Sequence, residues 1–247
     1  RGSMIGNGKI RIGTSGWHFG HWRGPFYPRK LPAREMLSFY AGRFRATEIN
    51  NTFYRLPTVD ALENWRETVP DDFIFAVKAS RFLTHMKKLK DPSVSLPLFL
   101  ERVAVLGDKL GPVLFQLPPR WRCDGERLRE FLAEMPAGRR CAFEFRDESW
   151  LTEDVFGILG AANAAFCIFD MEGGLSPLAV TADFVYLRLH GPGGAYQGSY
   201  DEAALAAWAQ RIGRWSREGK DVFCFFDNDE NGCAPLNALV LQGLLTE

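Results

Sequence analysis

Eight short runs of β-prone residues, spaced so that a helix fits after nearly every one, constrain the fold of this chain more than any other feature. The runs are IRIGT from Ile10, ATEIN from Ala46, FIFAVK from Phe73, VLFQL from Val113, CAFEF from Cys141, AFCIFD from Ala165, FVYLRLH from Phe184 and VFCFFD from Val222. Amphipathic stretches lie near residues 32–42, 58–68, 96–107, 125–135, 150–162, 202–218 and 235–245. Strands and helices that alternate in this way form a parallel sheet.

Eight such units in 247 residues predict closure of the sheet into a single (β/α)8 TIM barrel. No GxGxxG motif follows any run, which argues against an open dinucleotide-binding sheet. The segment MEGGLSPLAVTAD after the sixth run has no helical period, so we expect one irregular βα unit there. We expect residues 1–3 to be an expression-tag scar and residues 4–247 to form one barrel domain that begins at Met4.

Four residues predict where helices begin and end. Asp124 and Asp201 suit N-cap positions, and Pro235 suits a first helical turn. Gly219 suits the position just after a helix end.

The composition excludes several classes of protein. The 30 Lys and Arg residues balance the 30 Asp and Glu residues, so no net field attracts a polyanion, and nucleic acid is a disfavoured partner. No apolar stretch is long enough to span a membrane, so we expect no membrane partner. Five cysteines, an odd number without a CxxC motif, predict reduced thiols in a cytoplasmic protein.

Side chains alternate along a strand, and this parity predicts which strand-end residues face a pocket. In the third, fifth and seventh runs, every second residue is large and apolar. The residues between them, which point to the opposite face, end in polar side chains. We therefore expect five side chains to converge on one cavity at the carboxyl ends of the strands: Lys78, Glu144, Arg146, Arg188 and His190. The remaining strand ends are also polar, with Ser15, Glu48, Asn50, Gln116, Asp170, Asp227 and Asn228. An alternative is that Glu144, Arg146 and Arg188 only form a buried salt-bridge network.

Four loops could contribute to the same site. The aromatic loop GWHFGHWRGPFYP, with Trp17, could be a lid or stacking platform, or could simply pack over the barrel mouth. We expect its two histidines, His18 and His21, to be surface or packing residues. The segment KASRFLTHMKKLKD is locally positive, and the seventh and eighth loops are rich in glycine, as in phosphate-binding loops.

A series of motifs runs through the chain from Ile10: IGTSGW, FYP, EINNTFYRLP, FAVKASRFLTH, GPVLFQLPP, AFEFRDESW, TADFVYLRLHG and FDND. In this order they resemble the domain-of-unknown-function 72 family, also called YecE-like. The resemblance implies a barrel related to the xylose isomerase and endonuclease IV architectures, and it brings no established activity. It implies motif membership for Glu48, Asn50, Tyr54, Lys78, His85, Gln116, Glu144, Arg146, Arg188, His190 and Asp227.

The leading hypothesis is an enzyme acting on a small anionic molecule, sugar-like or phosphorylated, without a cofactor. The sequence does not distinguish a hydrolase, a lyase or an isomerase. The candidate acid–base residues are Glu48, Glu144, His190 and Asp227. The candidate substrate-binding residues are Trp17, Asn50, Tyr54, Lys78, His85, Gln116, Arg146 and Arg188. A Schiff base at Lys78 is a variant of this hypothesis.

Two other functions stay open. A metal-dependent hydrolase or isomerase could hold a divalent cation through Glu144, Asp170, His190 and Asp227, although Arg146 and Arg188 would compete for the carboxylates. A non-catalytic module could bind nucleic acid through the aromatic loop and the basic run. The oligomeric state does not follow from the sequence.

Overall fold

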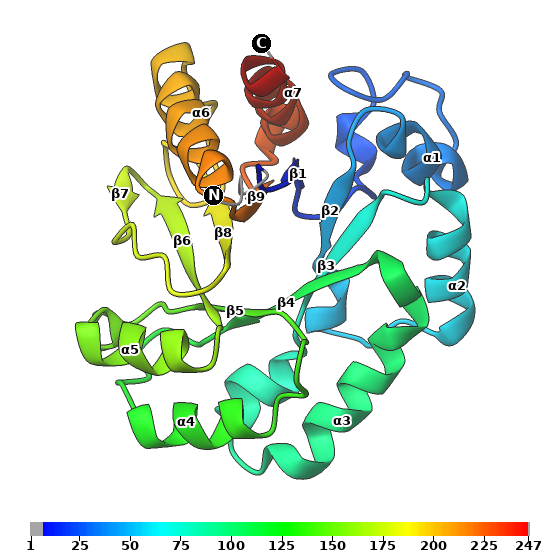
Figure 1. The fold of residues 1–247 in the computed structure, drawn as a ribbon. Helices are drawn as coiled ribbons and strands as arrows, with labels where there is room; N and C mark the ends of the chain where they lie inside the picture. The colour runs from blue at the N-terminus through cyan, green and yellow to red at the C-terminus, as the bar shows by residue number, and fades with distance from the viewer. Residues whose placement is uncertain (1–6, 247) are drawn as a thin grey trace, which may run out of the picture. The chain divides into compact units, whose positions relative to one another are not determined.

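The computed structural model describes residues 7–246, in which strands and helices alternate along the chain (Figure 1). The strands are β1 (Ile10–Thr14), β2 (Ala46–Ile49), β3 (Ile74–Lys78), β4 (Leu110–Gln116), β5 (Cys141–Glu144), β6 (Ala165–Met171), β7 (Gly174–Leu175), β8 (Phe184–Leu189) and β9 (Asp221–Phe226). The helices are α1 (Met36–Ala41), α2 (Val59–Thr68), α3 (Pro92–Val103), α4 (Gly125–Ala133), α5 (Glu153–Ala161), α6 (Glu202–Arg217) and α7 (Cys233–Thr246). The expected tag scar and Met4 lie outside the described residues.

The sheet follows the order β1-β9-β8-β6-β5-β4-β3-β2, and β7 pairs with β6 outside this order. The pairings β1 with β9, β8 with β9, and β3 to β6 in succession are parallel. Eight strands in this order, with helices between them, form the predicted (β/α)8 barrel. All eight predicted strands and seven predicted helices are present, with shifted ends: α3 begins at Pro92, whose fixed φ suits a first turn. No helix in residues 7–246 is long and apolar enough to cross a membrane.

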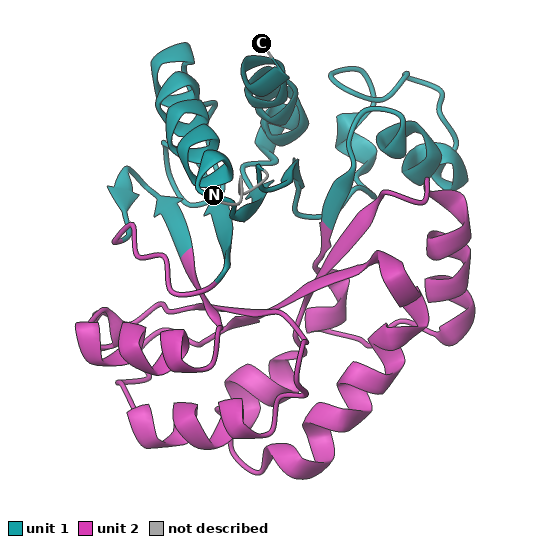
Figure 2. Cartoon of the chain, viewed as in Figure 1, with its two compact units in different colours: residues 1–47, 168–176, 183–247 teal, residues 48–167, 177–182 magenta. Residues whose placement is uncertain are grey.

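The chain forms two compact units, shown in teal and magenta in Figure 2. Unit 1 contains the described part of residues 1–47 together with residues 168–176 and 183–247. Unit 2 contains residues 48–167 and 177–182. Each unit has its own buried aromatic cluster.

In unit 2, phenylalanines on the strands pack against a helix. The rings of Phe115 on β4 and Phe143 on β5 are stacked with centroids 5.1 Å apart. Phe131 on α4 meets both edge-on, at 5.0 and 6.2 Å. Because Phe143 faces α4, the neighbouring Glu144 faces the opposite side of the sheet, as its parity predicts.

In unit 1, β9 lies between β1 and β8, and aromatic rings fill the space around them. Tyr186 of β8 contacts Phe225 of β9 at 5.4 Å between ring centroids. A second cluster forms between the loop after β1 and α1, where Trp22 and Tyr27 are almost completely buried. The packing interpretation of the aromatic loop is therefore correct for these two rings.

The irregular βα unit after β6 is a short hairpin followed by a loop. Asp170 pairs with Leu175 and Met171 with Gly174 in an antiparallel ladder. Glu172 and Gly173 form the turn, and both have positive φ, at 54° and 75°, as a type I′ turn requires. The structure confirms that no helix follows β6 before β8.

The predicted helix boundaries follow from local hydrogen bonds. Asp124 accepts from the backbone N of Arg127 at 3.1 Å, and Asp201 accepts from that of Ala204 at 2.8 Å. Gly219 follows α6 with φ of 84°, a conformation that glycine adopts without strain. Both N-caps and this helix end are confirmed.

Candidate active site

The residues predicted to form the site fall into two groups, one in each compact unit (Figure 2). Unit 2 holds Glu48, Asn50, Tyr54, Lys78, His85, Gln116, Glu144 and Arg146. Unit 1 holds Trp17, Asp170, Arg188, His190 and Asp227. The convergence of both groups on one cavity stays a prediction.

The unit 2 group contains two carboxylates, Glu48 and Glu144 at the end of β5. Both are completely buried, with 0% exposure. Arg146 donates from Nε to Glu144 Oε1 over 2.6 Å, and its Nη2 lies 2.5 Å from the same oxygen. The thiol of Cys167 donates to the other oxygen, Oε2, at 3.7 Å. Charge-assisted hydrogen bonds of this kind are about twice as strong as neutral ones, so they fix the position of the carboxylate.

Gln116 and Lys78 stand at the ends of the strands next to Glu144. Gln116 is the direct register partner of Glu144 across β4 and β5. Lys78, at the end of β3, aligns with Leu114 of β4. The carboxyl ends of β3, β4 and β5 therefore present a cation, an amide and an ion-paired carboxylate side by side.

Lys78 is positioned by the segment that follows β2. Its Nζ lies 4.2 Å from the ring centroid of Phe53, in cation–π contact. Its backbone carbonyl accepts from Thr52 Oγ1 at 2.6 Å. These two contacts fix Lys78 from both ends, because one holds the ammonium and the other holds the main chain.

His85, in the short helical turn Phe82–Met86, completes this group. Its ring meets Phe53 edge-on at 4.9 Å, and its Nδ1 lies 2.8 Å from Thr84 Oγ1. Burial, and then the positive charges of Lys78, Arg81 and Arg146, lower the pKa of His85. The ring is thus neutral at pH 7, and a neutral imidazole carries one N–H that can donate to a ligand.

Asn50 and Tyr54 flank the same segment with opposite environments. Asn50 follows β2, and its Oδ1 is buried without a hydrogen-bond partner among residues 7–246. The Tyr54 side chain is 77% exposed and touches Phe53 at 4.9 Å between ring centroids. The amide oxygen of Asn50 is therefore buried, whereas Tyr54 lies at the surface.

In unit 1, Asp227, which follows β9, contacts two buried residues. They are Arg188 on β8 and His190 just after β8. Arg188 Nη2 and His190 Nδ1 lie 3.5 and 3.2 Å from Asp227 Oδ2. Both have at most 1% exposure. A carboxylate at Nδ1 fixes the orientation of an imidazole, as in many acid–base dyads.

Asp170 and Tyr200 form a further contact in unit 1. Burial raises the pKa of Asp170, and a hydrogen bond from Tyr200 opposes this effect. The Tyr200 hydroxyl also accepts from the backbone N of Gly191 at 2.9 Å. Tyr200 therefore ties both ends of the glycine-rich loop after β8 to β6.

The aromatic loop contributes fewer accessible groups than the lid interpretation requires. Trp17 is 7% exposed, and its carbonyl accepts from the Tyr27 hydroxyl at 2.5 Å. His18 and His21 are exposed, and His21 Nε2 lies 2.9 Å from the carbonyl of Asp229. Both histidines are surface residues, as predicted.

The candidate metal ligands do not form a cluster within the described part of the chain. No group of three or more His, Cys, Asp or Glu side chains in residues 7–246 is arranged to hold a metal ion. Of the four candidates, Glu144 lies in unit 2, and Asp170, His190 and Asp227 lie in unit 1.

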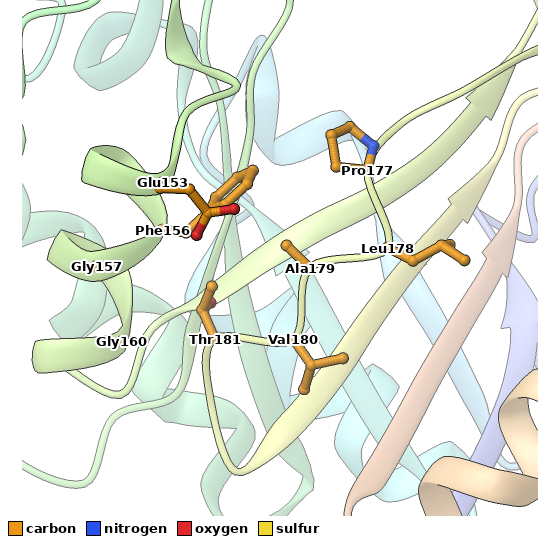
Figure 3. Close-up of a pocket in the computed structure, with 9 residues that line it drawn as sticks. All are labelled: Glu153, Phe156, Gly157, Gly160, Pro177, Leu178, Ala179, Val180 and Thr181. Atoms are coloured by element: carbon orange, nitrogen blue, oxygen red, sulfur yellow. The ribbon is translucent and has the colours of Figure 1, made fainter.

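A groove of about 630 Å³ in unit 2 lies elsewhere, between α5 and the loop of residues 177–181 (Figure 3). Glu153 is its one ionisable lining residue, and Phe156, Leu178 and Val180 supply apolar walls. None of the predicted site residues lines it. Its size alone does not make it a catalytic site, because its walls carry too few polar groups to orient a substrate.

A family model described as "Protein of unknown function DUF72" matches residues 11–247. The chain belongs to the DUF72 family. The sequence resemblance is thereby confirmed over almost the whole length. DUF72 membership brings no established activity, so the chemistry of the site must be argued from its own residues.

Known DUF72 relatives support the fold. A DUF72 family protein from Thermotoga maritima superposes with a TM-score of 0.88 at 29% identity, covering 97% of this chain and 100% of that chain. One from Enterococcus faecalis gives a TM-score of 0.81 at 20% identity, covering 96% of each chain, and shows the fold alone. The UPF0759 protein YunF of Bacillus subtilis is 26% identical, covering 96% of this chain and 94% of its own.

Three contacts in the DUF72 site were not predicted from the sequence. Cys167 is a buried free cysteine, and its thiol donates to Glu144. Its parity on β6 was the signal that could have shown this. Thr84 and Tyr200 gave no such signal, because both act from loops whose conformation no strand period describes.

Proposed function

We propose that this DUF72 protein is an enzyme that binds a small anionic substrate with Lys78 and Arg146 and transfers a proton through a buried glutamate, Glu48 or Glu144. One observation carries the proposal: besides burial, which lowers the pKa of the half-buried His85 most, three cations lie near enough to its ring to lower that pKa further, those of Lys78, Arg81 and Arg146. The chain as a whole has no net charge, so this concentration is local. An anionic ligand would balance it.

The environment of these groups favours strong contacts with an anion. The side chain of Arg146 is only 14% exposed, and Phe53 covers one side of the Lys78 ammonium. Water screens such charges poorly, so each hydrogen bond to a charged group contributes about 1.5 to 3 kcal/mol. Neutral His85 can add an N–H donor without adding charge.

The proton-transfer step is assigned to the buried carboxylates. A glutamate that excludes water can take a proton from a substrate O–H or C–H and return it later in the reaction. Hydrolysis, elimination and isomerisation all use such a step. Arg146 orients the Glu144 carboxylate, so we assign Glu144 the role of base and Glu48 that of its partner.

Anion binding is tested by calorimetric titration with inorganic phosphate at constant ionic strength. Lys78→Met should weaken binding about tenfold or more, because a loss of 1.5 to 3 kcal/mol corresponds to that range. The control is Lys88→Met, since Lys88 is exposed in the same unit. Equal losses in both variants would indicate a surface polyanion site, and no binding by the parent would refute the proposal.

Turnover is tested with a panel of sugar phosphates followed by NMR. Glu48→Gln and Glu144→Gln should lower turnover at least a hundredfold, in line with the contribution of a general acid or base, while phosphate still binds. Glu153→Gln, at an exposed position of α5, is the matched control and should leave turnover unchanged. Full activity in both buried-site variants would contradict the assignment of the proton-transfer step.

A further inference from the structure

The amide of Asn50, in the unit 2 site, has incomplete hydrogen bonding among residues 7–246. Its Oδ1 is buried and has no partner among these residues. Buried acceptors of this kind are rare, because an unmade hydrogen bond costs free energy. A bound group with a donor would satisfy it.

Several contacts place Asn50 beside the proposed anion site. It follows β2, which lies next to β3 in the sheet. Two residues later, Thr52 Oγ1 donates to the carbonyl of Lys78 at 2.6 Å, and Phe53 lies under the Lys78 ammonium. The turn Asn51–Phe53 therefore joins Asn50 to Lys78 through consecutive residues.

Parity gives Asn50 the same face of β2 as Glu48. Glu48 is completely buried, so this face is closed to bulk solvent at that level. The adjacent residue Asn51 is exposed. Of these two neighbouring asparagines, Asn50 is the one with a buried amide oxygen.

We propose that Asn50 accepts a hydrogen bond from a hydroxyl group of the substrate, so that the site selects hydroxylated anions such as sugar phosphates over anions that lack the hydroxyl. This inference rests on the proposed function, because Lys78 and Arg146 hold the anionic end. Asn50 contacts the hydroxyl group next to that end. Sites built to hydrogen-bond a hydroxyl discriminate strongly against its absence.

The test compares two probes that share a phosphate, glycerol 3-phosphate and n-propyl phosphate, by calorimetry on the full chain. The parent should bind glycerol 3-phosphate about tenfold more tightly, as expected for one buried hydrogen bond. Asn50→Ala should abolish this preference and leave the affinity for n-propyl phosphate unchanged. Asn51→Ala, the matched control, should keep the tenfold preference.

Asn50→Leu, which keeps the branched shape of the asparagine side chain without its polar atoms, provides a second variant in case the alanine variant is unstable. Equal binding of both probes by the parent overturns the role of Asn50 and leaves the anion site intact. A preference that survives in both Asn50 variants overturns it as well. If the parent binds neither probe, the proposed function itself fails, and the inference fails with it.

Discussion

The ion pair between Arg146 and Glu144 allows a quantitative test of the buried site. Arg146→Met should lower the free energy of unfolding by about 3 to 5 kcal/mol, the usual cost of leaving a buried charge unpaired. Methionine keeps much of the aliphatic stem and removes the Nε and Nη2 atoms that lie 2.6 and 2.5 Å from Glu144 Oε1. Water does not replace them, because Glu144 has 0% exposure.

The assay is urea unfolding followed by circular dichroism for the parent, Arg146→Met, Glu144→Gln and the double variant. Arg146→Met should cost clearly less in the Glu144→Gln background, because a neutral amide needs no counter-charge. The control is Arg34→Met: Arg34 lies 3.9 Å from Glu35, both side chains are more than half exposed, and the cost should be about 0 to 1 kcal/mol. The reasoning fails if Arg146→Met costs less than about 1 kcal/mol, or costs the same in both backgrounds.

Three further predictions concern His85, Gly191 and Asp201. Because the folded-state pKa of His85 is lowered, the unfolded chain binds that proton more tightly, and stability falls as the pH drops below about 6.5. His85→Gln should lose less stability than the parent between pH 7.5 and pH 5.5 in urea unfolding; equal losses would contradict this. Gly191→Ala should lower the Tm by several degrees, since φ is 111° and a Cβ would lie 2.2 Å from the carbonyl oxygen of Gln197; an unchanged Tm would disprove the clash. Asp201→Ala should cost about 1 kcal/mol through loss of the α6 N-cap, and a cost near zero would show that the cap is dispensable.

The sequence predicted the barrel and the orientation of its strands because both depend on periodic patterns. The alternation of Phe143 with Glu144 was enough to place one side chain against α4 and the other on the opposite face. The start of α4 after Asp124 was equally local, since an N-cap needs only one backbone partner.

Sequence periodicity does not predict features that depend on tertiary contacts. The strand β7 is two residues long, too short for any period to reveal. The lowered pKa of His85 results first from burial and then from three cations, of which Arg146 is distant in sequence from Lys78 and Arg81. Whether Lys78 and Arg146 share a cavity with Arg188 and His190 also depends on such contacts, and it stays a prediction.

The pairing of β1 with β9 has a consequence for synthesis of the protein on the ribosome. Lys9, just before β1, bonds to Asp221 at the start of β9, across 212 residues of chain. At about 5 to 20 residues per second, the first strand waits roughly 10 to 40 s for its partner to be translated. During that time β1 exposes an unpaired edge, so a chaperone that shields the nascent N-terminus should raise the yield of folded protein more than one that acts after release.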